Sequence, residues 1–149
     1  VRLGGSISDN LNIGEDRSDG NLVVAWSKWY RHFDSFVHQT WGSRHLSDGS
    51  ATVRISVTKN RSIVAEVLSS SGPPAFTQGV LAIFRDMEQN PGLTFPTQSH
   101  IDRVQFVDEY SSENGILRTR SLPQNNGGKS QVSSAPIMLT FIDFYSFKV

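Results

Sequence analysis

Four histidines are the most versatile residues of this chain, because imidazole binds metals and transfers protons near neutral pH. They are His32, His38, His45 and His100, and no two have His-x-x-x-His spacing. His32 and His38 would lie about 240° apart around a regular helix, so they cannot share one metal ion there. A site that joins His45, Asp48 and His100 through the fold is the alternative, but we expect no metal and no other cofactor.

Serine and carboxylate side chains are the other candidates for catalysis. The serine run at residues 69–71 precedes Gly72, but the Gly-x-Ser-x-Gly frame of a nucleophile turn is absent. No glycine loop followed by lysine offers a phosphate cradle. Asp108 and Glu109 are neighbours on an expected strand, so they would face opposite sides, which is poor geometry for joint acid and base catalysis. We interpret both as solvated charges and expect no enzymatic activity.

Composition limits the remaining functions. The 149 residues correspond to about one domain. Fourteen basic and 14 acidic residues balance, which leaves no electrostatic footprint for nucleic acid, so we expect no nucleic-acid partner. The absence of cysteine excludes disulfides and cysteine-bound metals. No apolar run approaches the roughly 18 residues that cross a bilayer, so we expect no direct membrane insertion by this segment.

Two stretches have the periodicity of amphipathic helices. In residues 22–41 apolar residues recur every three or four positions and Gly42 follows, which predicts a helix that ends there. That stripe consists of Trp26, Trp29, Tyr30, Phe33, Phe36, Val37 and Trp41. A second helix is predicted between Pro74 and the Asn-Pro-Gly at 90–92, with the stripe Phe76, Val80, Ile83, Phe84 and Met87. We interpret the aromatic stripe as core and not as a ligand-stacking surface.

Alternation of apolar and polar residues predicts the strands. Residues 51–58 and 62–68 form an expected antiparallel hairpin around Lys59-Asn60-Arg61, where Asn60 would tolerate a left-handed backbone. A third strand is expected at residues 103–110. Residues 137–149 are apolar on both faces, which predicts a buried or partner-covered strand.

The remaining segments are polar. Residues 1–21 are interpreted as a flexible N-terminal tail or linker, with a strand at residues 3–7 on a sheet edge as the alternative. Residues 111–136 contain several serines and a Gln-Asn-Asn-Gly-Gly run, which predicts a long loop that is mobile or functional. Residues 22–149 are thus expected to be a single α+β domain. Two helices would pack on one face of a three- to four-stranded, mainly antiparallel sheet.

The order of these elements over residues 22–110 resembles the C-terminal domain of the TonB and TolA family. Gly49 precedes the strand Ala-Thr-Val-Arg-Ile-Ser-Val, Ser-Ser-Ser-Gly at 69–72 opens the second helix, and Leu-Thr-Phe-Pro at 93–96 leads to a strand that ends on Tyr110. This is similar to the family's G-x-V-x-V-x-I strand, serine-and-glycine loop and L-P-F-P segment. The Asn60-Arg61 pair stands where the family usually has Asp-Gly, so this turn should have another geometry.

The resemblance implies a periplasmic domain, attached to the inner membrane by a segment absent from this chain, that couples to periplasmic or outer-membrane proteins. Family domains bind extended partner segments, often by adding a strand to an open sheet edge. We expect that edge in residues 104–110 or 141–147. The candidate contacts are Val104, Phe106, Asp108, Tyr110, Phe141, Asp143, Tyr145 and Phe147.

Three alternatives stay open. The sequence favours neither a TonB-like energiser of receptors nor a TolA-like tether, and it does not name the partner. From another functional class, the chain could be a secreted or virion-type structural or adhesion module that oligomerises through residues 137–149. A homodimer through that long terminal strand is compatible with either function.

Overall fold

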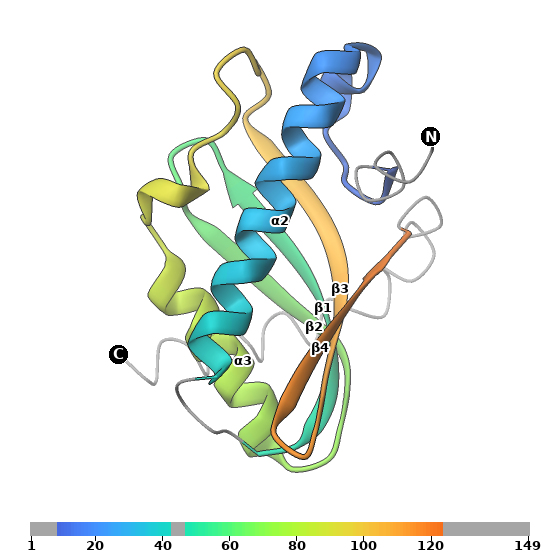
Figure 1. Ribbon diagram of the computed structural model, residues 1–149, viewed down its shortest axis with the longest axis vertical. Coiled ribbons are helices and arrows are strands. Elements are labelled where there is room, and N and C mark those ends of the chain that lie inside the picture. The colour runs from blue at the N-terminus through green and yellow to red at the C-terminus, as the bar shows by residue number, and fades with distance from the viewer. Residues whose placement is uncertain (1–8, 43–46, 124–149) are drawn as a thin grey trace.

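The computed structural model describes residues 9–42 and 47–123 of the chain. The elements in chain order are η1 (Gly14–Ser18), α2 (Gly20–Gly42), β1 (Gly49–Thr58), β2 (Ile63–Ser71), α3 (Pro74–Met87), η2 (Pro91–Leu93), β3 (Arg103–Glu113) and β4 (Ile116–Leu122). The four strands form one open antiparallel sheet in the order β2-β1-β3-β4. Both long helices lie on the same side of this sheet (Figure 1). The predicted α+β class is therefore confirmed.

The aromatic stripe of α2 is part of the core, as its periodicity predicted. Trp26, Trp29, Phe33 and other stripe residues are buried against the sheet. Phe106 of β3 lies at the centre of this packing, with its ring centroid 5.2 Å from that of Phe33 and 6.0 Å from that of Trp29, both nearly edge-on. Edge-to-face pairs of this kind each add about 0.5–1.5 kcal/mol beyond area burial. The stripe thus fixes α2 across the strands.

The N-terminal segment is folded from residue 9 onward, so the interpretation of residues 1–21 as a tail is wrong over residues 9–21. Leu11 and Ile13 are almost fully buried. Between them, Asn12 pairs with Gln105 of β3 through two backbone hydrogen bonds of 2.7 and 3.3 Å. Two apolar side chains at alternate positions are enough to dock an extended segment, although the average composition is polar. The alternative strand at residues 3–7 lies outside the described residues.

The expected loop at residues 111–136 is also wrong over its described part. β3 continues to Glu113, and β4 returns along it after the two-residue turn Asn114-Gly115, whose φ angles are 57° and 80°. An Asn-Gly pair adopts this left-handed conformation readily and is a strong hairpin signal. Asp48 braces the turn by accepting hydrogen bonds from the Asn114 and Gly115 amides at 2.8 and 3.0 Å. Residues 124–136 and the predicted strand at 137–149 lie outside the described residues.

The β1–β2 turn differs from expectation in one detail. The residue with the left-handed backbone is Arg61, with a φ of 70°, and not Asn60. The Arg61 amide donates to the Thr58 carbonyl at 2.8 Å and its carbonyl accepts from the Gln89 amide at 2.9 Å. These two bonds hold Arg61 in a conformation that arginine alone would not favour.

Candidate functional site

The four candidate contacts of β3 lie on one face of the strand and point into the core. Val104, Phe106, Asp108 and Tyr110 are all 0% exposed. β3 is an inner strand, because β1 pairs with it along its length and β4 pairs with residues 107–113. The prediction that residues 104–110 form the open edge is therefore wrong. The reason is β4, which lies within the predicted loop at residues 111–136 and covers the outer side of β3. The other four candidates, Phe141, Asp143, Tyr145 and Phe147, lie outside the described residues.

Asp108 is the centre of a buried polar cluster. Its Oδ1 accepts a hydrogen bond from the Tyr30 hydroxyl at 2.9 Å, and its Oδ2 accepts one from the Tyr110 hydroxyl at 3.0 Å. Burial raises the pKa of Asp108 to about 7, against the two tyrosine hydrogen bonds that lower it. Burial, and then the adjacent carboxylate, raises the pKa of both tyrosines above its usual range. The interpretation of Asp108 as a solvated charge is wrong.

Glu109 lies on the opposite side of β3, as the alternation predicted for adjacent strand residues. It accepts hydrogen bonds from Arg120 Nε at 2.9 Å and from Arg120 Nη2 at 2.7 Å. The two neighbouring carboxylates therefore have different roles. Asp108 ties α2 to the sheet core, whereas Glu109 makes a surface ion pair across β3 and β4.

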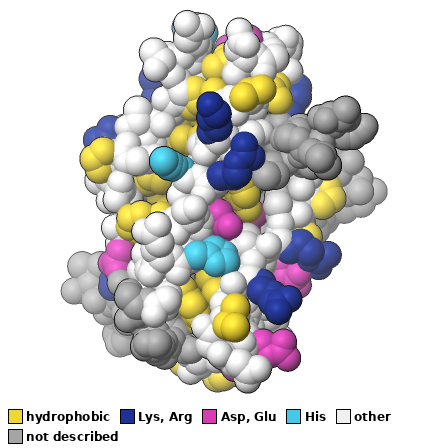
Figure 2. Space-filling view, in the orientation of Figure 1, with side chains coloured by type: hydrophobic (Ala, Val, Ile, Leu, Met, Phe, Trp, Pro, Cys, Tyr) yellow, Lys and Arg dark blue, Asp and Glu magenta, His cyan; other side chains and the backbone are white. Residues whose placement is uncertain are grey.

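A partly exposed extension of the cluster lies between α2 and β4. His38 Nε2 lies 2.8 Å from the Thr119 hydroxyl and 3.6 Å from Asp34 Oδ2. Among the described residues, the buried Asp34 Oδ1 has no hydrogen-bond partner. Figure 2 shows a histidine and an acidic side chain close together near the middle of this face. Because Asp108 and Tyr110 are completely buried, a substrate could not touch them in this conformation. The cluster and its extension connect α2 to β3 and β4.

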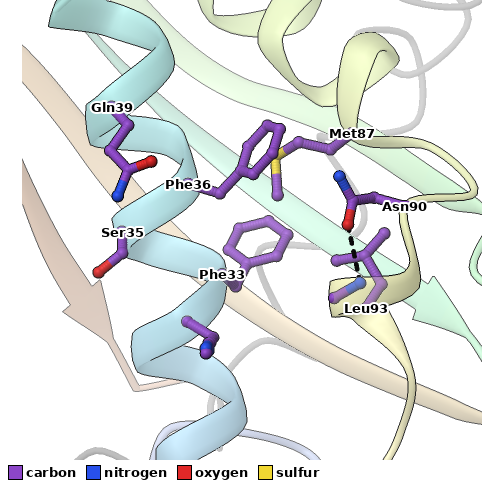
Figure 3. Close-up of a pocket in the computed structure, with 9 residues that line it drawn as sticks. Phe33, Ser35, Phe36, Gln39, Met87, Asn90 and Leu93 are labelled. Atoms are coloured by element: carbon purple, nitrogen blue, oxygen red, sulfur yellow. Dashed lines mark hydrogen bonds between the residues drawn. The ribbon is translucent and has the colours of Figure 1, made fainter.

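A hollow of about 250 Å³ lies between α2 and the segment around η2 (Figure 3). Phe33 and Phe36 lie beside Met87 and Leu93 there. The Asn90 side chain is already engaged, since its carbonyl oxygen accepts from the Gly92 amide at 2.7 Å. The lining contains no carboxylate that could act with His32 as an acid and base pair. This hollow is suited to an apolar side chain and not to bond-making chemistry.

The described residues give no support to a histidine metal site. Within residues 9–42 and 47–123, no three His, Asp or Glu side chains are grouped as metal ligands would be. Asp48, one member of the alternative site, is occupied as the cap of the β3–β4 turn. Hydrogen bonds from the Gly115 amide, the Ser112 hydroxyl and the Asn114 amide hold the pKa of Asp48 below its usual value. His45 lies outside the described residues.

The two edges of the sheet are β2 and β4. The register of β2 on β1 skips Leu68, which marks a bulge, and the carboxylate of Glu66 is buried beside Arg54 at 2.6 Å. The Ile63 amide at the start of β2 also donates a hydrogen bond to the Glu88 carboxylate at 3.3 Å. Bulges of this kind are features by which proteins protect an edge from pairing.

The β4 edge lacks these protections. Its seven residues pair with β3 without a register shift, and within the described part of the chain no backbone group outside β3 is bonded to it. One side chain is bonded to it near its end, since Asn10 Nδ2 donates to the Ser121 carbonyl at 3.3 Å. Ile116, Arg118 and Arg120 are exposed. The described part therefore offers β4 as the more open edge.

Sequence reasoning missed β4, although the Asn114-Gly115 pair beside Ile116 and Leu117 is a hairpin signal that could have indicated it.

In the part of the chain that the structure describes, no helix is both long and apolar enough to cross a lipid bilayer. Comparison of the chain with protein-family models, with curated proteins and with solved structures found no match.

Proposed function

We propose that this chain is a non-enzymatic protein-binding domain that adds an extended segment of a partner protein to an open edge of its sheet. The observation that carries the proposal is the β4 edge. This strand is regular, its side chains at 116, 118 and 120 are exposed, and among the described residues only β3 pairs with its backbone. The one side-chain bond to that backbone, from Asn10 to the Ser121 carbonyl, lies near its end and leaves residues 116–120 open. Strand addition needs only such an edge, because backbone groups supply affinity and alternate side chains supply selectivity.

The geometry of the polar groups supports binding over catalysis. The group with the most perturbed carboxyl pKa, Asp108, is sealed between α2 and β3. The hollow beside Phe36 is accessible but has no acid and base pair in its lining. A catalytic site needs reactive groups that a substrate can reach. The Asp108 cluster and this hollow have no residue in common.

The cellular setting that we propose follows from the resemblance of residues 22–110 to the C-terminal domains of TonB and TolA. In that setting the chain is periplasmic, an anchor to the inner membrane lies outside this chain, and the partners are periplasmic or outer-membrane proteins. We propose β4 as the pairing strand in place of residues 104–110, because β3 lies between β1 and β4 in the sheet.

The test is a backbone-amide NMR titration of the 149-residue chain with extended peptides from periplasmic and outer-membrane proteins of its source. We expect shifts that follow residues 116–122 as a continuous line. Each peptide has a matched control with proline at alternate positions, which removes the amide donors that pair with a strand. If no peptide binds to the folded chain, or if the proline controls bind equally well, the proposal is refuted.

A further inference from the structure

We infer that β4 selects partner segments with acidic side chains at alternate positions, through Arg118 and Arg120. This inference rests on the proposed function and names the chemistry of its partner. Basic side chains follow the course of β4 on the face shown in Figure 2.

The two arginines lie on the same face of β4. Leu117 is buried toward the helices, and Thr119 contacts His38 of α2, so the odd-numbered residues face the helix layer. Arg118 and Arg120 therefore face the other side of the sheet, about 7 Å apart along the strand. Both are exposed, and the Arg120 side chain is 71% accessible. A strand added outside β4 would place alternate side chains directly beside them.

The two arginines differ in how far their charge is already neutralised. Arg120 is opposite Glu109 on β3 and bonds to it at 2.7 Å. Arg118 is opposite Ser111, which is neutral. A partner carboxylate beside Arg118 would make a new pair, whereas one beside Arg120 would share its arginine with Glu109. We therefore assign the larger part of the selectivity to Arg118.

The same two charges oppose pairing of β4 with a second copy of the chain. A two-fold antiparallel pair of β4 strands centred on Arg118, on Thr119 or on Arg120 places two arginines directly opposite each other in every case. Like charges at opposite positions destabilise a strand pair. The edge is thus biased against its own copy and toward a partner of opposite charge.

The experiment compares three eight-residue peptides that differ at two alternate positions and otherwise consist of threonine and valine. The two positions carry Glu, Gln or Lys, and affinity for the 149-residue chain is measured by NMR titration at low and at high salt. We expect the Glu peptide to bind roughly 5-fold more tightly than the Gln peptide, from pair energies of this kind. The Lys peptide should bind most weakly, and added salt should shrink these differences.

Substitutions then assign the selectivity to residues. Arg118→Gln should remove most of the preference for Glu over Gln, and Arg120→Gln should remove less. The matched control is Arg103→Gln, an exposed arginine at the start of β3, which should leave the preference unchanged.

The outcomes separate this inference from the function on which it rests. If all three peptides bind along residues 116–122 with equal affinity, strand addition stands and acidic selection is overturned. Shifts along residues 63–71 would also overturn the inference, because the partner would then use β2. If none of the three binds while envelope-derived peptides do, the inference fails alone, and if neither set binds, both proposals fail.

Discussion

Replacing Asp108 by Asn should make the folded chain more stable at pH 8 and should remove most of the pH dependence of its stability between pH 5 and 8. Asp108 is completely buried and is surrounded by Tyr30, Tyr110 and the Asp34 carboxylate. A neutral carboxyl there can accept from one tyrosine hydroxyl and donate to the other, and an asparagine amide can do the same with its carbonyl oxygen and one of its two N–H donors.

The magnitude follows from the pKa of Asp108, which rises from 3.8 in the unfolded chain to about 7 in the fold. Between these two values the folded chain binds more protons than the unfolded chain, so the free energy of unfolding falls as pH rises. The full loss is about 4 kcal/mol, at about 1.4 kcal/mol for each pH unit of difference. From pH 5 to pH 8 the loss is about 2–3 kcal/mol. Below about pH 3 both states are protonated and this contribution no longer changes.

The assay is urea denaturation of the wild-type chain and of Asp108→Asn at pH 5, 6, 7 and 8. The difference between the two proteins at each pH isolates the contribution of Asp108 from that of every other titratable group. We expect the stability of the variant relative to the wild type to rise by about 2–3 kcal/mol from pH 5 to pH 8. Glu109→Gln, its neighbour on the solvent side of β3, is the matched control and should show no such gain.

Two results would refute the reasoning. If the difference between Asp108→Asn and wild type does not change with pH, the Asp108 pKa is not raised by burial. If the variant is less stable than wild type by more than about 1 kcal/mol at pH 8, the ionised carboxylate contributes a net stabilisation. In either case, burial of the ionised Asp108 carboxylate would not lower the free energy of unfolding as we expect.

Three further substitutions test the architecture through urea denaturation. Tyr30→Phe should destabilise by about 1–3 kcal/mol at pH 8, where Asp108 loses a donor while ionised, and by less at pH 5; an equal loss at both pH values would contradict this. Gly49→Ala should cost about 1–3 kcal/mol, because the added carbon would lie 2.8 Å from a side-chain carbon of α3, whereas Gly20→Ala, with open space, is the neutral control. Ile13→Ala should cost about 2–5 kcal/mol if the segment before α2 belongs to the core, and no loss would restore the tail interpretation.

The sequence by itself determined the elements whose pattern is local. The Trp26 to Trp41 stripe repeats every three or four residues and can bury one face only as a helix, and the alternation in residues 51–58 predicts a strand. The strand is confirmed, but Arg54 and Ser56 on its predicted solvent side are buried as well. The α+β class follows from these patterns, because each apolar face must be covered by another element. The burial of Asp108 had a local signal too, since it shares a face with Val104, Phe106 and Tyr110.

The tertiary structure decided which groups meet. Tyr30 is 78 residues from Asp108 in the chain, and no local pattern shows that its hydroxyl reaches that carboxylate. Strand order likewise depends on contacts that are distant in sequence. β4 pairs with the outer side of β3, so the strand expected at the edge is an inner strand. Periodicity reports only which face of an element is buried. The pairing of elements depends on contacts distant in sequence, and that pairing determined which edge of this sheet remains open.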